Sequence, residues 1–120
     1  MNGLAVKKIH VTNFMIKVIL KENAWQAKLA AKKLGHTSAA IVFGRTIYLY
    51  NVDKTNFIKN QSWLKHEIAH VNQYEELGLI KFILFYLIES MIKGYANNRF
   101  EVEARKMEND DQILSGVAIV

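Results

Sequence analysis

The most constraining feature of this chain is the run His66-Glu67-Ile68-Ala69-His70, in which two histidines stand four positions apart. On an α-helix, side chains at that spacing lie on one face with Cβ atoms about 5–6 Å apart, so both imidazoles can reach a single ion. Ile68 and Ala69 between them are apolar and compatible with a helix. The run therefore predicts a helix that is partly buried and presents two imidazoles in one direction.

Two imidazoles on one helical turn are typical ligands of Zn²⁺, which they bind at about 2.0–2.1 Å. Glu67 is rotated away from the pair but stays beside it, which suits a carboxylate that contacts a water on the metal and not the metal itself. We interpret Glu67 as a general base. The competing interpretation is a surface helix with two solvated histidines that share this spacing by chance. His10 and His36 have no ligand-like spacing, and we expect them to be ordinary surface or core residues.

The chain contains no cysteine, which excludes both a disulfide framework and a thiolate metal site. Structural zinc is usually closed by four ligands rich in cysteine, whereas hydrolytic zinc has three nitrogen or oxygen ligands and one open position. The composition therefore favours an open, catalytic site. With 120 residues, 51% of them apolar and 22% charged, the chain is expected to form one globular domain over residues 1–120.

The formal charge of +5 does not by itself indicate a nucleic-acid partner. The lysines are scattered, with Lys7-Lys8 and Lys32-Lys33 as their adjacent pairs, and no nucleic-acid-binding signature is present. We therefore expect no nucleic acid as a partner. The oligomeric state is left open by the sequence.

The most apolar run, residues 77–92, contains Lys81 and Glu89 and is shorter than the roughly 18–20 uninterrupted residues of a spanning helix. We expect a buried helix there, which argues against membrane association and keeps a membrane-surface role as a minor alternative. Residues 1–20 lack the order of a secretory signal, because charged residues interrupt the apolar stretch and no small-residue cleavage site follows. A cytoplasmic location is the resulting expectation.

Local patterns in the first half predict three elements. Residues 1–20 could be a strand or a short helix, since Ile9 and Val11 alternate and an apolar run follows. A helix is expected over 24–34, capped by Asn23 and ended by Gly35. Residues 39–43 and 46–50 are β-branched and aromatic around Gly44-Arg45, which predicts an antiparallel hairpin.

The second half is predicted to be helical. Residues 51–60 are polar and indicate a loop, after which Asn60 or Ser62 could cap a helix that ends at Gly78. A second helix over 79–93 should end at Gly94, and a third should run from near Asn98 through Met107, with a frayed tail from Ser115. The expected fold class is α+β: a small antiparallel or mixed sheet packed on the histidine-bearing helix, followed by two further helices.

A third ligand must come from another segment, because two histidines do not hold a catalytic zinc well. Glu101 and Glu103 lie on the last predicted helix, which can fold back against the histidines after the breaks at Gly78 and Gly94. Asn98 followed three residues later by Glu101 also fits a capping box, in which the carboxylate would accept from a backbone N–H. The residues alone leave these alternatives open.

Residues 66–74 (HEIAHVNQY), together with Gly94-Tyr95 and residues 98–104 (NRFEVEA), resemble the minimal gluzincin metallopeptidases, which are small zincin domains. The resemblance spans residues 63–106. In the broader gluzincin class the third zinc ligand is a glutamate followed three residues later by a small residue. Glu101 with Ala104 fits this pattern, and Glu103 does not. The resemblance therefore implies Zn²⁺ held by His66, His70 and Glu101.

The resemblance further implies a zincin-like fold and a zinc-dependent peptidase in which Glu67 is the general base. It also implies a peptide or protein substrate as the partner. An edge strand above the cleft would pair with that substrate in extended form, and residues 46–50 are expected to be that strand. An alternative is a metal-binding, zincin-like regulatory or latent module without general peptidase turnover. Its basis is a departure from the family: many gluzincins have an acid or amide, which orients a zinc-bound histidine, where this chain has Arg105. Many relatives also have proline at the position of Arg99.

Overall fold

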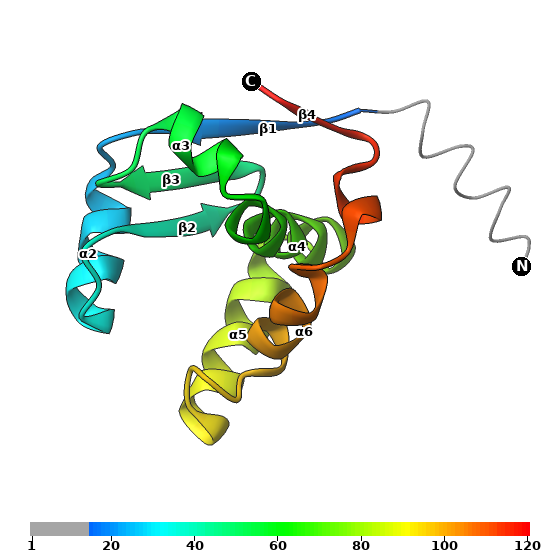
Figure 1. Ribbon diagram of the computed structural model, residues 1–120. Coiled ribbons are helices and arrows are strands. Elements are labelled where there is room, and N and C mark those ends of the chain that lie inside the picture. The colour runs from blue at the N-terminus through cyan, green and yellow to red at the C-terminus, as the bar shows by residue number, and fades with distance from the viewer. Residues whose placement is uncertain (1–14) are drawn as a thin grey trace, which may run out of the picture.

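The computed structural model describes residues 15–120, so the expectations for Ile9, His10 and Val11 lie outside the described residues (Figure 1). From Ile16 the strand alternative is confirmed, because β1 (Ile16–Lys21) is a strand with Val18 and Leu20 buried on one face. The side chains alternate between the core and the outside, as expected of a strand covered on one face.

The described strands form a mixed four-stranded sheet in the order β2-β3-β1-β4. β2 (Ala39–Phe43) and β3 (Thr46–Tyr50) form the predicted antiparallel hairpin, and Gly44 has the positive φ of 61° that a glycine-first turn requires. β1 pairs in parallel with β3 and with β4 (Val117–Ile119). The predicted α+β class with a mixed sheet is confirmed, but the prediction of a frayed tail is wrong, since β4 completes the sheet.

The structure corrects the expected position of the edge strand. β3, residues 46–50, lies inside the sheet because β1 pairs with the side of β3 that β2 leaves open. The edge at this end of the sheet is β2, residues 39–43. The two strands of the hairpin have equal length and similar composition, so the local pattern could not determine which of them remains unpaired on one side.

The histidine-bearing helix α4 (Gln61–Leu77) packs against the sheet through Leu64, Ile68 and Val71, which belong to the same apolar core as the inward side chains of the strands. Asn60 caps the helix by accepting a hydrogen bond from the Trp63 amide at 3.2 Å, and the helix ends at Gly78 as predicted.

The prediction of a loop over 51–60 is wrong for its second half, where α3 (Lys54–Lys59) forms. Asp53 caps this short helix by accepting from the Asn56 amide, and Phe57 is completely buried. The helix was not predicted because its residues are mostly polar, and Phe57 is the one side chain of α3 that is buried in the core.

Helix α2 (Trp25–Leu34) packs against β2 and β3 and ends at Gly35, which has a φ of 72°. The end of this helix was predicted correctly, but the cap was not. Asn23 has a left-handed φ of 54°, and Ala24 occupies the cap position without a side-chain hydrogen bond.

Helix α5 (Leu79–Lys93) and helix α6 (Arg99–Met107) follow α4 as the two predicted further helices (Figure 1). The expectation that residues 77–92 form a buried helix is wrong, because Phe82 is the one residue of α5 that is fully buried. Within residues 15–120, no helix is long and apolar enough to cross a membrane. After α6, the short 3-10 helix η1 (Asp111–Leu114) is tied to α4 by an ion pair between Lys65 and Asp111.

Candidate metal centre

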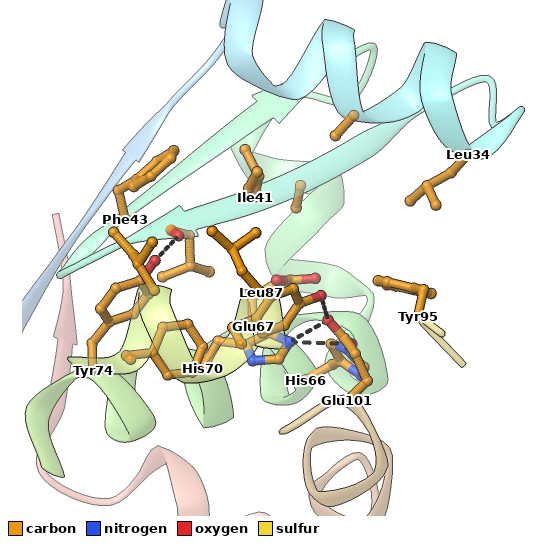
Figure 2. Close-up of a pocket in the computed structure, with 16 residues that line it drawn as sticks. Leu34, Ile41, Phe43, His66, Glu67, His70, Tyr74, Leu87, Tyr95 and Glu101 are labelled. Atoms are coloured by element: carbon orange, nitrogen blue, oxygen red, sulfur yellow. Dashed lines mark hydrogen bonds and ion pairs between the residues drawn. The ribbon is translucent and has the colours of Figure 1, made fainter. Parts of the chain in front are cut away.

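His66, His70 and Glu101 converge at the junction of α4 and α6, and together they could hold a metal ion (Figure 2). Each offers one ligand atom, and these atoms all lie within 4.8 Å of one another. The two imidazoles have ring centroids 5.1 Å apart on consecutive turns of α4, and Glu101 comes from the first turn of α6. The helical pairing of the histidines and the approach of Glu101 both follow the expectation from the sequence.

The distances fit a divalent ion with nitrogen and oxygen ligands. Two ligand atoms at about 2.1 Å from a tetrahedral ion stand about 3.4 Å apart. Nε2 of His66 lies 3.0 Å from Oε1 of Glu101, and Nε2 of His70 lies 3.3 Å from both carboxylate oxygens of Glu101. The two histidine–glutamate distances are therefore close to those between two ligands of one ion. The set has three protein ligands, which leaves one tetrahedral position for another group.

The outer nitrogens of both histidines have oxygen partners that fix their orientation. Nδ1 of His66 lies 2.8 Å from Oε2 of Glu108, and Nδ1 of His70 lies 2.8 Å from Oε1 of Gln73. The amide nitrogen of Gln73 donates to the Phe100 carbonyl at 3.1 Å and to Glu103 at 2.7 Å, so its oxygen must face His70. Each Nδ1 is therefore a donor, and each Nε2 is left to face Glu101.

This arrangement brings three electron-pair donors together in the centre of the site. If both Nδ1 atoms carry the proton, neutral histidines offer only lone pairs at Nε2 to the carboxylate of Glu101. These lone pairs find partners when the histidines are protonated at Nε2 and positively charged, or when a cation lies between the three groups. His70 and Glu101 are only 7% and 3% exposed, so bulk solvent satisfies these groups poorly.

In the metal-free protein, protons take the place of the cation. Burial opposes a positive charge on His66, yet its hydrogen bonds to Glu101 and Glu108, together with neighbouring carboxylate charge, raise its pKa to about 9. Burial also opposes a positive charge on His70, but its hydrogen bond to Glu101 and the charges of Glu67 and Glu101 raise its pKa. Burial opposes the charge on Glu101, but hydrogen bonds from the histidines hold its pKa far below the usual value. The site is thus built around one negative charge that attracts cations.

Two contacts hold Glu101 in place. The Tyr86 hydroxyl on α5 donates to Oε2 of Glu101 at 2.5 Å. Asn98, which is fully buried, donates to the Tyr86 carbonyl at 3.0 Å and to the Ser90 hydroxyl at 2.8 Å, and accepts from the Phe100 amide at 2.8 Å. Asn98 therefore joins the start of α6 to α5 and caps α6 itself. Because Asn98 supplies the cap, Glu101 is free to face the histidines.

The departures at Arg99 and Arg105 do not leave the site without support. The Arg99 amide donates to Glu89 at 3.0 Å, a contact that a proline could not make. Arg105 points to the loop before α6, where it donates to the Ala96 carbonyl. The role of an acid at position 105 is taken by Glu108 for one histidine and by Gln73 for the other.

Glu67 lies on the same turn of α4 and lines a cleft of about 270 Å³ between α4, α5 and β2 (Figure 2). It is 6% exposed, and burial raises its pKa to about 7. His66, His70 and Glu101 line the same cleft, so all four predicted site residues meet there. The remaining wall is apolar and includes Ile41, Leu34 and Leu87, while Tyr95 lies at its rim.

Two residues of the site were not predicted from the sequence, Tyr86 and Glu108. Tyr86 stands in an apolar helix with no local signal, and only the folding of α5 against α6 brings it to Glu101. Glu108 had a usable signal: it follows Glu101 by seven residues, which places both on the same side of a continuing helix. Glu103, the rival ligand, is directed to Gln73 instead of the histidines.

Replacing Glu108 with alanine should weaken metal binding by about 10- to 100-fold, because His66 loses the acceptor that fixes its ring. Titration of the metal-free protein with zinc against a competing chelator measures this change. Glu76→Ala is the matched control, since Glu76 is an exposed carboxylate on the far part of α4. Equal affinities of the two variants would show that Glu108 does not orient the ligand.

No family model, curated protein or solved structure matches this chain. Any functional assignment therefore depends on the residues of α4 and α6 and on their geometry.

Proposed function

We propose that this protein is a zinc-dependent peptidase of the gluzincin type. The observation that carries the proposal is the convergence of His66, His70 and Glu101 beside a buried carboxylate, Glu67, on the wall of one cleft. Three nitrogen and oxygen ligands with one further position are typical of catalytic zinc and differ from the closed sets of structural zinc.

The proposal names zinc because two imidazoles and one carboxylate are its usual catalytic ligands. When bound, zinc supplies a Lewis acid that polarises a carbonyl and lowers the pKa of a coordinated water towards about 7. His66, His70 and Glu101 would hold the ion, while Tyr86 keeps the carboxylate of Glu101 in place from its outer side.

Glu67 would transfer the proton. In the protein without bound metal, burial raises the pKa of its carboxyl to about 7, so this group takes up a proton more readily than an exposed glutamate. In the proposed reaction Glu67 accepts the proton of the attacking water and then donates it to the amine that leaves when the peptide bond breaks. The ligand Glu101 cannot serve in this way, because its hydrogen bonds keep it ionised.

β2 would position an extended peptide along the cleft. Phe43 and Thr46 flank the two-residue turn and form its closing pair, so the backbone groups of Ala40 and Val42 face the open edge of the sheet. The Tyr74 hydroxyl donates to the Val42 carbonyl at 2.9 Å and so ties the edge strand to α4. The free groups of this edge are available for β-augmentation by a substrate backbone.

The test is peptide cleavage that depends on the metal. Purified protein is incubated with a diverse peptide mixture, and new termini are identified by mass spectrometry, first with zinc, then after chelation and dialysis, and finally after zinc is restored. We expect cleavage to stop on chelation and to return with zinc, because the proposed activation of water depends on the bound ion.

Stoichiometric zinc binding without cleavage of any peptide would contradict the proposal and favour the regulatory or latent module. The distinction is kinetic: an enzyme forms more product than there is protein, whereas a binding module saturates. Failure to bind zinc at all would exclude both alternatives.

A further inference from the structure

A second surface of this protein is not explained by the candidate metal centre. Helix α5 extends away from the sheet, with α6 along one side (Figure 1). Its inner side is occupied by Phe82, Tyr86 and Ser90, which recur every four residues and contact α4 and α6. The opposite side, here called the outer face, carries large apolar residues that are 44–84% exposed. They are Ile80, Leu84, Ile88, Met91 and Ile92.

This pattern differs from that of an ordinary surface helix, whose apolar side chains face the core and whose charges face water, because α5 is apolar on its inner and on its outer side. The one charged residue among the outer-face positions is Lys81, which lies near the start of the helix. A helix of this length is about 22 Å long, so the outer face is a continuous apolar ridge and not a set of scattered residues.

We propose that the outer face of α5 docks onto an anionic membrane surface and lies in the interface with its apolar side chains among the acyl chains. The charge of the protein is complementary to that partner. The whole chain has a formal charge of +5, and the segment from Gly78 to Arg99 contains three cationic side chains against one carboxylate, Glu89. That carboxylate is already engaged by Lys93 at 3.3 Å and by the Arg99 amide at 3.0 Å.

Lys81 distinguishes this partner from a second copy of the chain. At the membrane interface its methylene stem can lie along the apolar ridge while the ammonium group reaches lipid phosphates. Against a second copy, the ammonium group would meet another outer face, which contains no carboxylate to pair with it. Two copies would also each carry the same charge of +5, which opposes their association.

The test is co-sedimentation of the full chain with vesicles. One preparation contains equal parts of phosphatidylcholine and phosphatidylserine, and the other contains phosphatidylcholine alone. We expect binding to the anionic vesicles that weakens as salt is raised. The double variant Ile80→Gln/Met91→Gln should bind them roughly tenfold more weakly or worse, because it removes the two most exposed apolar side chains of the ridge.

The matched control is Trp25→Gln/Leu29→Gln, which removes two exposed apolar side chains from α2, where they are 67% and 59% exposed. This variant should bind as the parent does. Lys81→Glu should weaken binding to the anionic vesicles roughly tenfold. All four substituted apolar positions are exposed, and thermal unfolding followed by circular dichroism verifies that each variant is folded.

Three results would overturn the proposal. The first is no binding to anionic vesicles, or equal binding to both vesicle types. The second is an equal loss of binding in the α2 control. The third is a dimer in sedimentation equilibrium that Ile80→Gln/Met91→Gln dissociates, which would assign the outer face to a second copy. None of these measurements depends on zinc or on peptide cleavage, so the proposal is independent of the proposed peptidase function.

Discussion

The Glu67→Gln variant is expected to retain zinc and to lose peptide cleavage by a factor of about 10²–10⁴ in kcat/KM. Glutamine has nearly the same shape as glutamate, so the cleft should keep its form, but an amide cannot accept a proton from water. Glu67 points into the cleft and is not one of the three converging ligands, which is why metal content should be unaffected. Cleavage rates and zinc content are measured on the same purified samples.

Glu76→Gln is the control for this substitution. It removes a carboxylate from the same helix at an exposed position outside the cleft, so both cleavage and zinc content should match the parent. If Glu67→Gln cleaves peptides as fast as the parent at equal zinc content, proton transfer must be assigned to another group. If Glu67→Gln loses zinc together with activity, Glu67 must act on the metal site and not on the water.

Features of the fold that depend on neighbouring residues could be predicted from the sequence. Gly44-Arg45 fixed the hairpin because a two-residue turn needs a positive φ at its first position. Gly78 and Gly94 ended α4 and α5 because the backbone there has a positive φ, 84° and 81°, which glycine adopts most readily. The pairing of β1 with β3 and β4 could not be predicted, because it joins segments far apart in the chain.

The burial of α5 could not be read from its composition. An apolar run such as residues 77–92 indicates that a helix has apolar surface to cover, but not whether this chain covers it. In the structure, α4 and α6 contact the inner side of α5 through Phe82 and Tyr86 and leave the outer face exposed. The helix and its bounds could therefore be predicted from the sequence, whereas the side of the helix that is buried depends on how α4 and α6 pack against it.

The candidate site divides in the same way. His66, Glu67 and His70 are neighbours on one turn, so their mutual arrangement follows from the helix alone. Glu101 needed a family pattern to distinguish it from Glu103, and the structure separates the two by the direction of their side chains: one faces the histidines and the other faces Gln73. Glu108 reaches His66 only after α6 has folded against α4. Gln73 and His70 are three residues apart on α4, and α6 fixes the direction of the Gln73 amide.

The Glu101→Ala variant is expected to bind zinc more than about a hundredfold more weakly than the parent, since removing a ligand costs more than the 10- to 100-fold typical of groups that only orient one. It also leaves the Tyr86 hydroxyl without its acceptor and both Nε2 atoms without an anion. Peptide cleavage should be lost with the metal. Zinc affinity is measured by competition with a chelator, and unfolding in excess chelator shows whether the metal-free variant is folded.

The Glu103→Ala variant should be measured in the same way, because Glu103 is the other carboxylate of this segment that could be the third ligand. Its loss removes one of two acceptors of the Gln73 amide, and the Phe100 carbonyl remains to hold Gln73 towards His70. Zinc affinity should therefore fall by no more than about tenfold, the lower end of the effect of an orienting group. A larger loss in Glu103→Ala than in Glu101→Ala would make Glu103 the third ligand. Equal affinities of both variants and the parent would mean that the two histidines bind zinc without a carboxylate from α6, and the peptidase proposal would lose its basis.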